Sequence, residues 1–417
     1  MEGVGTGRGS NSAQLRRYNE RLVLQRLRRA GEASKADLAR AADLTNTAIG
    51  GIIETLADLG LIEVVGKRHG GGRGQPATLL RPRADGAYGI GVRLDRHSIE
   101  TILIDFGGRI LARRDYDMVL PPPEAALELV CRDIEALLAT LDAPARGRFA
   151  GIGVAYPYNL GAWLGRLSLP PSAFERWDSY DFPARLAEAT ELPVFGENDG
   201  NAAAIAELFY GVGRKADDFL YLFIGPAIGG GIVVGGDCIR GSHGNAGDVA
   251  VLPVAPSRLA STPPALDGRE LLITRASLSA LVRHLAWHGE RAEGAAALEA
   301  AVRAAHPATS EWLDDMVDAL SPSVWAALSL LDLPLVVIDS DIGGGLVEAV
   351  LARLDGALDR DKPEARRPPR LAHGSFGRNA GAIGAASLPM FFNFSPRASI
   401  LTRAGSERGA RDLIVDA

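Results

Sequence analysis

The spacing of apolar residues predicts three helices and two strands in the first eighty residues. Over residues 15–29, apolar side chains recur every three or four positions, the period of a helix with one buried face. Ser34-Lys-Ala-Asp37 fits a capping box that opens a short second helix, and a third is expected over 45–59. Two short apolar runs, 61–65 and 77–80, predict strands on either side of a Gly-rich tip.

This order of elements is typical of a winged helix-turn-helix, in which the start of the third helix enters the major groove of DNA. The residues expected to face the bases are Thr45, Asn46, Thr47 and Gly50. Those expected at phosphates are Lys35, Lys67, Arg68 and Arg73, the last also suited to the minor groove. The alternative is a helical hairpin whose basic face is solvated.

Beyond a linker near residue 85, the pattern changes to strands that alternate with helices. Strand-like apolar runs occupy 88–94, 100–105, 149–155, 193–196, 219–224 and 335–338. Helical periodicity covers 125–138, 202–209, 310–333 and 346–359. Such alternation predicts a mixed α/β sheet covered by helices.

Composition is that of a folded globular chain of two or three domains. The 417 residues are 47% hydrophobic and 23% charged. No apolar run approaches the roughly 20 residues that span a bilayer, and the N-terminus lacks the apolar core of a secretory signal, so we expect a cytoplasmic protein. Two cysteines, Cys131 and Cys238, are too few for a disulfide framework.

The net charge of −6 conceals a split along the chain. Residues 1–83 carry a net charge of +6, and the remainder carries −12. Because such asymmetry indicates that one segment meets an anionic polymer, it favours DNA as a partner of the first segment.

One segment reads Glu197-Asn-Asp-Gly-Asn-Ala-Ala-Ala-Ile-Ala-Glu207. It is similar to the E-N-D-x-N-A-A-A-x-A-E signature of the ROK family of repressors, open reading frames and kinases. Residues 224–233 resemble the family's second Gly-rich loop. Residues 241–248 resemble its G-x-x-G-x-A-G-E segment, and residues 375–386 resemble its C-terminal helix. The first 80 residues resemble the DNA-binding segment of the repressor branch, which includes xylose and N-acetylglucosamine repressors.

The resemblance implies a winged helix-turn-helix followed by a two-lobed actin-like, sugar-kinase (ribonuclease H-like) ATPase-type α/β fold. The expected units are a DNA-binding domain at 1–84, a first lobe at 85–197 completed by a C-terminal helix at about 380–395, a second lobe at 198–379 and a polar tail at 396–417.

The same resemblance separates kinases from repressors at two loops. Family kinases carry D-x-G-G-T in the first strand–turn–strand, where this chain has Arg93 and then Asp95-Arg96-His97. Their G-T-G-x-G loop is here Gly225-Pro-Ala-Ile-Gly229, and Pro226 removes an amide donor. We therefore expect neither ATP binding nor catalysis. The alternative is a ROK-type carbohydrate kinase that phosphorylates a monosaccharide with ATP.

The residues expected to bind an effector follow from the same comparison. Asp199 stands at the family's catalytic base, and without a nucleotide Asp199 and Asn198 are suited to hydrogen-bond sugar hydroxyls. Asn198 and Asp199 also fit a helix N-cap, and both roles can coexist. Further expected contacts are Asp248, His243 and, by stacking, Tyr156.

The family's structural zinc site is expected to be absent. Val251 stands where the family has His, and residues 252–262 contain no Cys, so the tetrahedral His/Cys set is missing. No metal or other cofactor is expected.

Together these observations predict a ligand-responsive transcriptional regulator, a repressor. Its expected partners are a double-stranded DNA operator, a sugar or sugar derivative, and further copies of itself in a homodimer or homotetramer, since such proteins read palindromic half-sites.

Overall fold

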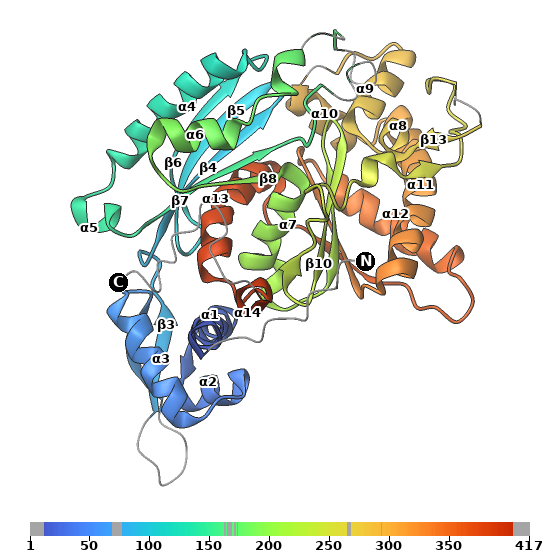
Figure 1. The fold of residues 1–417 in the computed structure, drawn as a ribbon. Helices are drawn as coiled ribbons and strands as arrows, with labels where there is room; N and C mark the ends of the chain where they lie inside the picture. Colours follow the sequence, from blue (N-terminus) through green and yellow to red (C-terminus); the bar gives the residue numbers. More distant parts are fainter. Residues whose placement is uncertain are drawn as a thin grey trace, which may run out of the picture.

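The computed structural model describes residues 12–402 except 69–76, 162–163, 165–168, 171, 173, 265–267 and 293 (Figure 1). In that part of the chain, no helix has both the length and the apolar character needed to cross a membrane.

The N-terminal unit consists of three helices and a small antiparallel sheet. The helices are α1 (Ser12–Ala30), α2 (Lys35–Ala42) and α3 (Asn46–Asp58). The sheet has the order β1–β3–β2, formed by β1 (Ala33–Ser34), β3 (Ala77–Pro82) and β2 (Ile62–Arg68). The short strand β1, which sequence reasoning did not predict, pairs with β3 through Ala33 opposite Leu80.

Local hydrogen bonds explain where α2 and α3 begin. The Ser34 hydroxyl accepts from the Asp37 backbone N–H at 3.2 Å, and the Asp37 carboxylate accepts from the Ser34 N–H at 3.1 Å. The predicted capping box is therefore present. Thr45 caps α3 by accepting from the Ala48 N–H at 3.2 Å. Leu27, Ile49 and other apolar side chains of the three helices are buried between them.

The rest of the chain contains two five-stranded sheets with the same connectivity. The first has the order β6–β5–β4–β7–β8. Its strands are β4 (Tyr88–Asp95), β5 (Ser98–Asp105), β6 (Ile110–Asp117), β7 (Phe149–Tyr156) and β8 (Val194–Asn198). The second has the order β11–β10–β9–β14–β15. Its strands are β9 (Phe219–Ile224), β10 (Ile228–Val234), β11 (Asp237–Cys238), β14 (Leu335–Ser340) and β15 (Arg370–His373). In each sheet the first three strands are antiparallel and the last two are parallel to the first.

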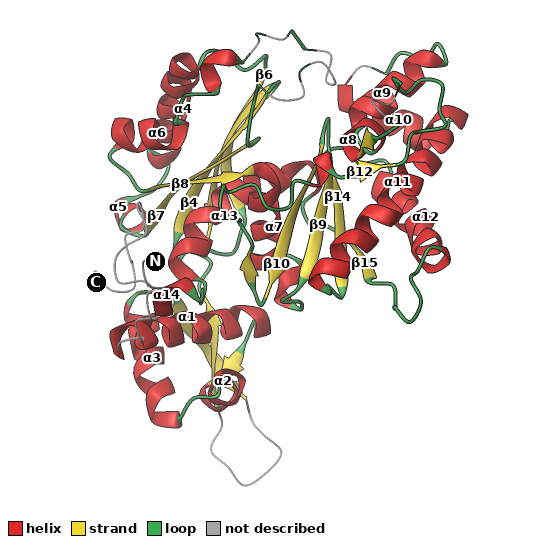
Figure 2. Cartoon of the chain, turned by 45° about the vertical axis from the view of Figure 1, so that its right-hand side comes forward, coloured by secondary structure: helices red, strands yellow, loops and turns green. Residues whose placement is uncertain are grey.

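Helices cover the outer faces of both sheets, and two further helices lie between the sheets (Figure 2). Those near the first sheet are α4 (Pro123–Leu138), α5 (Ala143–Arg146) and α6 (Phe182–Thr190). Those near the second are α8 (Leu272–Arg275), α9 (Leu278–Trp287), α10 (Gly294–Arg303), α11 (Pro307–Leu331) and α12 (Leu346–Arg360), with a two-stranded ribbon of β12 (Pro253–Val254) and β13 (Glu270–Leu271). The central pair is α7 (Asp199–Phe209) and α13 (Ala380–Phe394), and the short α14 (Ser399–Thr402) follows.

Helix α13 packs unusually close to its neighbours because glycines face it. A Cβ atom added to Gly91 in β4 or to Gly153 in β7 would overlap backbone atoms of Ala386 or Ala385. A Cβ added to Gly384 of α13 would lie 2.7 Å from the carbonyl carbon of Ala202 in α7. The first sheet, α13 and α7 therefore pack backbone against backbone.

A methyl group at Gly91 should destabilise the protein. We expect Gly91→Ala to lower the free energy of unfolding by roughly 1–3 kcal/mol, because the rigid backbone of α13 cannot yield. Urea unfolding measures the change. The matched control is Gly356→Ala in α12, where a Cβ meets nothing within 4 Å and helix propensity predicts a small gain. Equal stability of the two variants would contradict the packing argument.

Candidate functional site

The first turn of α3 is exposed at the end of the N-terminal unit. Thr45, Asn46 and Thr47 are all exposed, as expected for side chains that face a partner. Gly50 is half-buried, since a Cβ there would lie 2.8 Å from Nζ of Lys35. The Lys35 ammonium therefore lies against Gly50 of α3, next to the exposed turn.

Two of the three predicted wing residues belong to strand β2. Lys67 is exposed near the end of β2. Arg68 is the last residue of β2, and its side chain lies outside the described part of the chain. Arg73 also lies outside the described residues.

Several arginines of α1 contact the body of the protein. Arg21 is buried and donates to the carbonyl oxygen of Phe392 at 3.2 Å. Arg28 donates to the carbonyl oxygen of Phe209 and lies 3.0 Å above the ring of Phe209. Arg29 pairs with Asp217 at 3.0 Å. The apolar period of residues 15–29 predicted one buried face, but Arg21 and Arg28, which lie off the apolar positions, contact a second neighbour of α1 that this period does not reveal.

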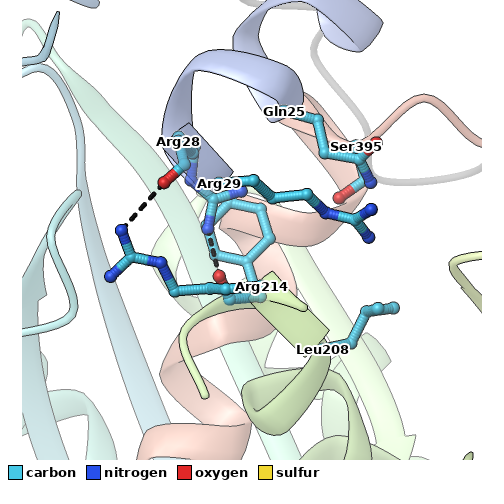
Figure 3. Close-up of a pocket in the computed structure, with 7 residues that line it drawn as sticks. Gln25, Arg28, Arg29, Leu208, Arg214 and Ser395 are labelled. Atoms are coloured by element: carbon cyan, nitrogen blue, oxygen red, sulfur yellow. Dashed lines mark hydrogen bonds between the residues drawn. The ribbon is translucent and has the colours of Figure 1, made fainter. Parts of the chain in front are cut away.

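Arg28 closes the C-terminal end of α7 (Figure 3). The carbonyl that it binds belongs to the last residue of α7, and Arg214 donates in turn to the carbonyl oxygen of Arg28 at 2.9 Å. Burial lowers the pKa of the Arg28 guanidinium, and Tyr210 opposes that effect. A cation at a helix C-terminus is favoured by the helix dipole and by the carbonyls that lack partners there.

Arg93 is the centre of a buried cluster at the end of β4. Its guanidinium donates to Glu100 at 2.7 Å and to Asp95 at 3.1 Å, and it lies 4.0 Å from Asp341. Burial opposes its charge, but the three carboxylates outweigh burial and raise the pKa of Arg93. A Cβ on Gly381 would lie 2.5 Å from Cδ of Arg93, so the side chain fills the space beside α13.

Arg96 joins the β4–β5 turn to the loop after β7. It is buried and donates to the carbonyl oxygens of Leu160 and Asn159, both at 3.1 Å. The turn that the family's kinases build with glycines is thus filled by two arginine side chains.

Asn198 and Asp199 lie where β8 passes into α7. The helix begins at Asp199, three residues earlier than its apolar pattern predicted, because Asn198 caps it. The Asn198 side-chain oxygen accepts from the N–H groups of Gly200 and Asn201 at 2.9 and 3.3 Å, so the cap role is present and its NH₂ group is the part suited to a ligand. In register, Asn198 pairs with Tyr156, which is half-buried.

The Asp199 carboxylate is held in a strongly charged environment. Burial raises the pKa of Asp199, nearby Asp95 raises it further, and Arg93 and Arg96 oppose both. The carboxylate accepts from the Gly200 N–H at 2.8 Å.

The segment 241–248 approaches the first turn of α7. A Cβ on Gly247 would lie 3.1 Å from the carbonyl oxygen of Gly230, and Gly200 is also in close contact with Gly230. Asn201 donates to the Gly244 carbonyl at 3.5 Å. The structure thus brings Asp248 into the neighbourhood of Asn198 and Asp199.

The two expected ligand groups of this segment differ in their surroundings. Asp248 is half-buried and accepts from the Asn245 amide at 3.0 Å. His243 is exposed on the same segment.

Sequence reasoning gave no role to Glu197 and Cys238, which both contact the side chain of Asn201 in the first turn of α7. Glu197 is buried, pairs with Arg240 and accepts from the Asn201 amide at 3.4 Å. Burial raises the pKa of Glu197, and Arg240 opposes the rise. The buried Cys238 thiol donates to the Asn201 side-chain oxygen at 3.8 Å. Their place next to the E-N-D-x-N segment was the available signal.

Two duplicated sheets with central helices are the architecture of sugar kinases and their relatives. The ROK family model matches residues 89–390, which is most of the chain, so this protein belongs to the ROK family. The family assignment made from sequence motifs is confirmed.

This chain is similar to two curated relatives. The uncharacterized protein y4fQ of Sinorhizobium fredii is 29% identical over 383 residues, 90% of this chain and 91% of that protein. The putative xylose repressor of a Caldicellulosiruptor species is 26% identical over 245 residues, 58% of this chain and 60% of the repressor.

Two crystal structures share the fold. A ROK family transcriptional regulator, a homologue of the E. coli MLC protein, has a TM-score of 0.66 at 22% identity over 90% of this chain and 96% of its own. A ROK family glucokinase from Streptomyces griseus, in complex with glucose and AMPPNP, has a TM-score of 0.56 at 22% identity over 72% of this chain and 99% of its own.

Removing the Arg93 charge should destabilise the protein in a pH-dependent way. We expect Arg93→Met to cost roughly 3–5 kcal/mol at pH 7, because buried carboxylates lose their counter-charge. Burial already raises the pKa of Asp341 against the opposing charge of Arg93. In the variant that pKa rises further above its unfolded value, so stability is lost as pH rises and regained on acidification. Urea unfolding at pH 7 and pH 5 should show the deficit shrinking at pH 5.

The control for this experiment is Arg113→Ala. Arg113 also contacts Glu100, at 3.2 Å, but its side chain is 39% exposed. We expect a loss below about 1 kcal/mol at both pH values. A deficit of Arg93→Met that is small, or that grows on acidification, would contradict the cluster's electrostatic role.

Proposed function

We propose that this chain is a DNA-binding transcriptional regulator, a repressor, whose sugar-kinase-like part senses a sugar or sugar derivative without phosphorylating it. The observation that carries the proposal is that one chain has both an exposed first turn of α3 and a β4–β5 turn whose surroundings are filled by Arg93 and Arg96. The first is suited to read DNA, and the second leaves no glycine-lined space for phosphates.

The N-terminal unit supports DNA binding through its order of elements. Three helices followed by the β2–β3 hairpin match a winged helix-turn-helix, with α3 as the recognition helix. The exposed Asn46 amide is suited to paired hydrogen bonds with adenine, and the Thr47 methyl to thymine. Lys35 and Lys67 are exposed cations for phosphates, and Arg68 and Arg73 are proposed to extend that set. The repressor names among the relatives agree with this role.

The second Gly-rich loop supports the absence of phosphoryl transfer. The loop between β9 and β10 is held by the start of α9, where Ser279 donates to the Pro226 carbonyl at 2.7 Å and the Leu278 N–H donates to the Gly225 carbonyl at 2.8 Å. Phosphoryl transfer needs backbone amides directed at the phosphates and an anchor for Mg²⁺, and here Pro226 and Arg93 stand at those places.

The effector is proposed to bind around the N-terminal end of α7. Asp199, the Asn198 amide group, Asp248 and Tyr156 supply acceptors, donors and an aromatic face suited to a polyol. The proposed role of His243 is a contact from the exposed part of the 241–248 segment. Neither a nucleotide nor the family's zinc ion is part of this proposal.

Helix α7 gives the effector a direct route to the DNA-binding unit. Its N-terminal end carries Asn198 and Asp199, and its C-terminal end is held by Arg28 of α1, about 16 Å away along 11 residues. A ligand that shifts α7 changes the seat of Arg28 and with it the placement of α1. Differential binding of the ligand to two arrangements then alters operator affinity.

Two copies of the chain are proposed to act together, as a homodimer or homotetramer. A palindromic operator presents two half-sites about one helical turn apart, and a symmetric dimer places one α3 in each.

The second candidate function, a carbohydrate kinase, has one observation in its favour. The burial that raises the pKa of Asp199 is a property expected of a catalytic base. Sugar-dependent ADP release that is abolished by Asp199→Asn would establish kinase activity and overturn the proposal that the sugar is sensed without being phosphorylated.

The recognition role of α3 can be tested with a labelled duplex from the region upstream of the gene. We expect Asn46→Ala to weaken specific binding by roughly 1–3 kcal/mol, because a paired contact to a base is lost. Lys35→Ala should lower the slope of log affinity against log salt concentration by about 1. Fluorescence anisotropy measures both. The control is Lys362→Ala, an exposed lysine of the body. Unchanged binding by Asn46→Ala and Lys35→Ala would refute the assignment.

The coupling role of Arg28 can be tested with sugars that raise the melting temperature of the full chain. Wild-type protein should change its operator affinity when such a sugar is added. Arg28→Met keeps the side chain's length but removes the contacts with Phe209, so we expect DNA binding that no longer responds to the sugar. Arg40→Met, in the same unit but exposed on α2, is the control. A full response in Arg28→Met would show that α7 does not carry the signal.

A further inference from the structure

A group of metal-binding side chains lies where α9 meets α11, away from the proposed effector site. His284 and His288 stand one helical turn apart at the end of α9, and Glu311 stands near the start of α11. One ligand atom of each residue lies within 4.8 Å of the other two. In the part of the chain that the structure describes, this is the one His, Cys and carboxylate group of that kind.

The two ring nitrogens of His284 differ, because only one of them makes a hydrogen bond. Its side chain is buried, with 2% of the residue exposed, and its Nδ1 lies 2.8 Å from the Ser261 hydroxyl. Its Nε2 is buried and makes no well-aligned hydrogen bond, although Oε2 of Glu311 lies 3.3 Å away. A buried nitrogen without a partner is unfavourable, whereas an imidazole whose other nitrogen is held by a polar group is the usual form of a metal ligand.

The distances within the group match a tetrahedral site. Oε2 of Glu311 lies 3.3 Å from Nε2 of His284 and 3.4 Å from Nε2 of His288. Bonds of 2.0–2.1 Å from zinc to nitrogen or oxygen place neighbouring tetrahedral ligands about 3.4 Å apart. Two of the three edges therefore already have the required length, and His288 and Glu311 are exposed enough for an ion to enter.

We propose that His284, His288 and Glu311 bind a divalent transition-metal ion, zinc, with water at the fourth position. Two imidazoles and one carboxylate suit zinc, whereas Ca²⁺ and Mg²⁺ prefer sets of oxygen ligands. The ion joins the end of α9 to the start of α11 and, through Ser261, to the segment before β13.

The competing account of the same geometry is a carboxylate shared between two histidines without a metal. That account needs a well-aligned hydrogen bond between Nε2 of His284 and the Glu311 carboxylate, and the described geometry has none.

The test uses the full chain, free of any histidine tag and stripped of metal by chelation. Competition with a chromophoric zinc indicator should show one equivalent of Zn²⁺ bound. His288→Ala and Glu311→Gln should each weaken binding by at least about tenfold, since each removes one ligand. His373→Ala is the matched control, because His373 is exposed and lies 3.2 Å from Glu348 in a simple pair. That variant should bind zinc like the wild type.

Two further readouts distinguish a built site from loss of fold. Zn²⁺ should raise the melting temperature of the wild type and of His373→Ala, but not that of His288→Ala, whose exposed side chain leaves the core intact. Co²⁺ should give the visible absorption of a tetrahedral ion in the wild type and in His373→Ala, but not in His288→Ala. No stoichiometric zinc binding, or equal affinity in His288→Ala and Glu311→Gln and the wild type, would overturn the proposal.

Discussion

The close approach of backbone around α13 is the constraint on which the rest of the structure depends. Gly91 and Gly153 allow the helix to lie directly on the first sheet, and Gly384 allows α7 to lie directly on the helix. Because no side chain separates α7 from α13, the two helices have little freedom to move independently, and a shift of α7 has to include α13. Asn198 and Asp199 at its beginning, and Phe209 at its end, are consequently placed by backbone contacts and not by flexible side chains.

Two arginines, Arg93 and Arg28, neutralise different buried acceptors. Arg93 neutralises carboxylates from β4, β5 and the segment after β14, and Arg28 neutralises the carbonyl end of α7. Neither arginine is free for a substrate or for DNA. The sequence-level charge of +6 in the first 83 residues therefore overstates the cations that the N-terminal unit presents to an operator.

Local signals in the sequence were sufficient for most elements, and long-range contacts were not visible in them. The capping box at Ser34 and the Thr45 cap follow from short-range hydrogen bonds, so they could be predicted. The apolar period placed the start of α7 three residues late, at 202, whereas the N-cap recognised at Asn198 marks the true start of the helix. The docking of Arg28 and the meeting of His284 with Glu311 depend on residues brought together by the fold; only the spacing of His284 and His288 was available beforehand.

The seat of α1 on the body has a consequence for the modular view of such proteins. A unit joined by a plain linker can be exchanged between proteins, but here the N-terminal unit is fixed to the rest of the chain through Arg21, Arg28 and Arg29 and their acceptors at Phe392, Phe209 and Asp217. A chimera that transplants residues 12–84 alone would leave these arginines and their acceptors without partners. The N-terminal unit and the rest of the chain have therefore to change together, which restricts how this unit can diversify.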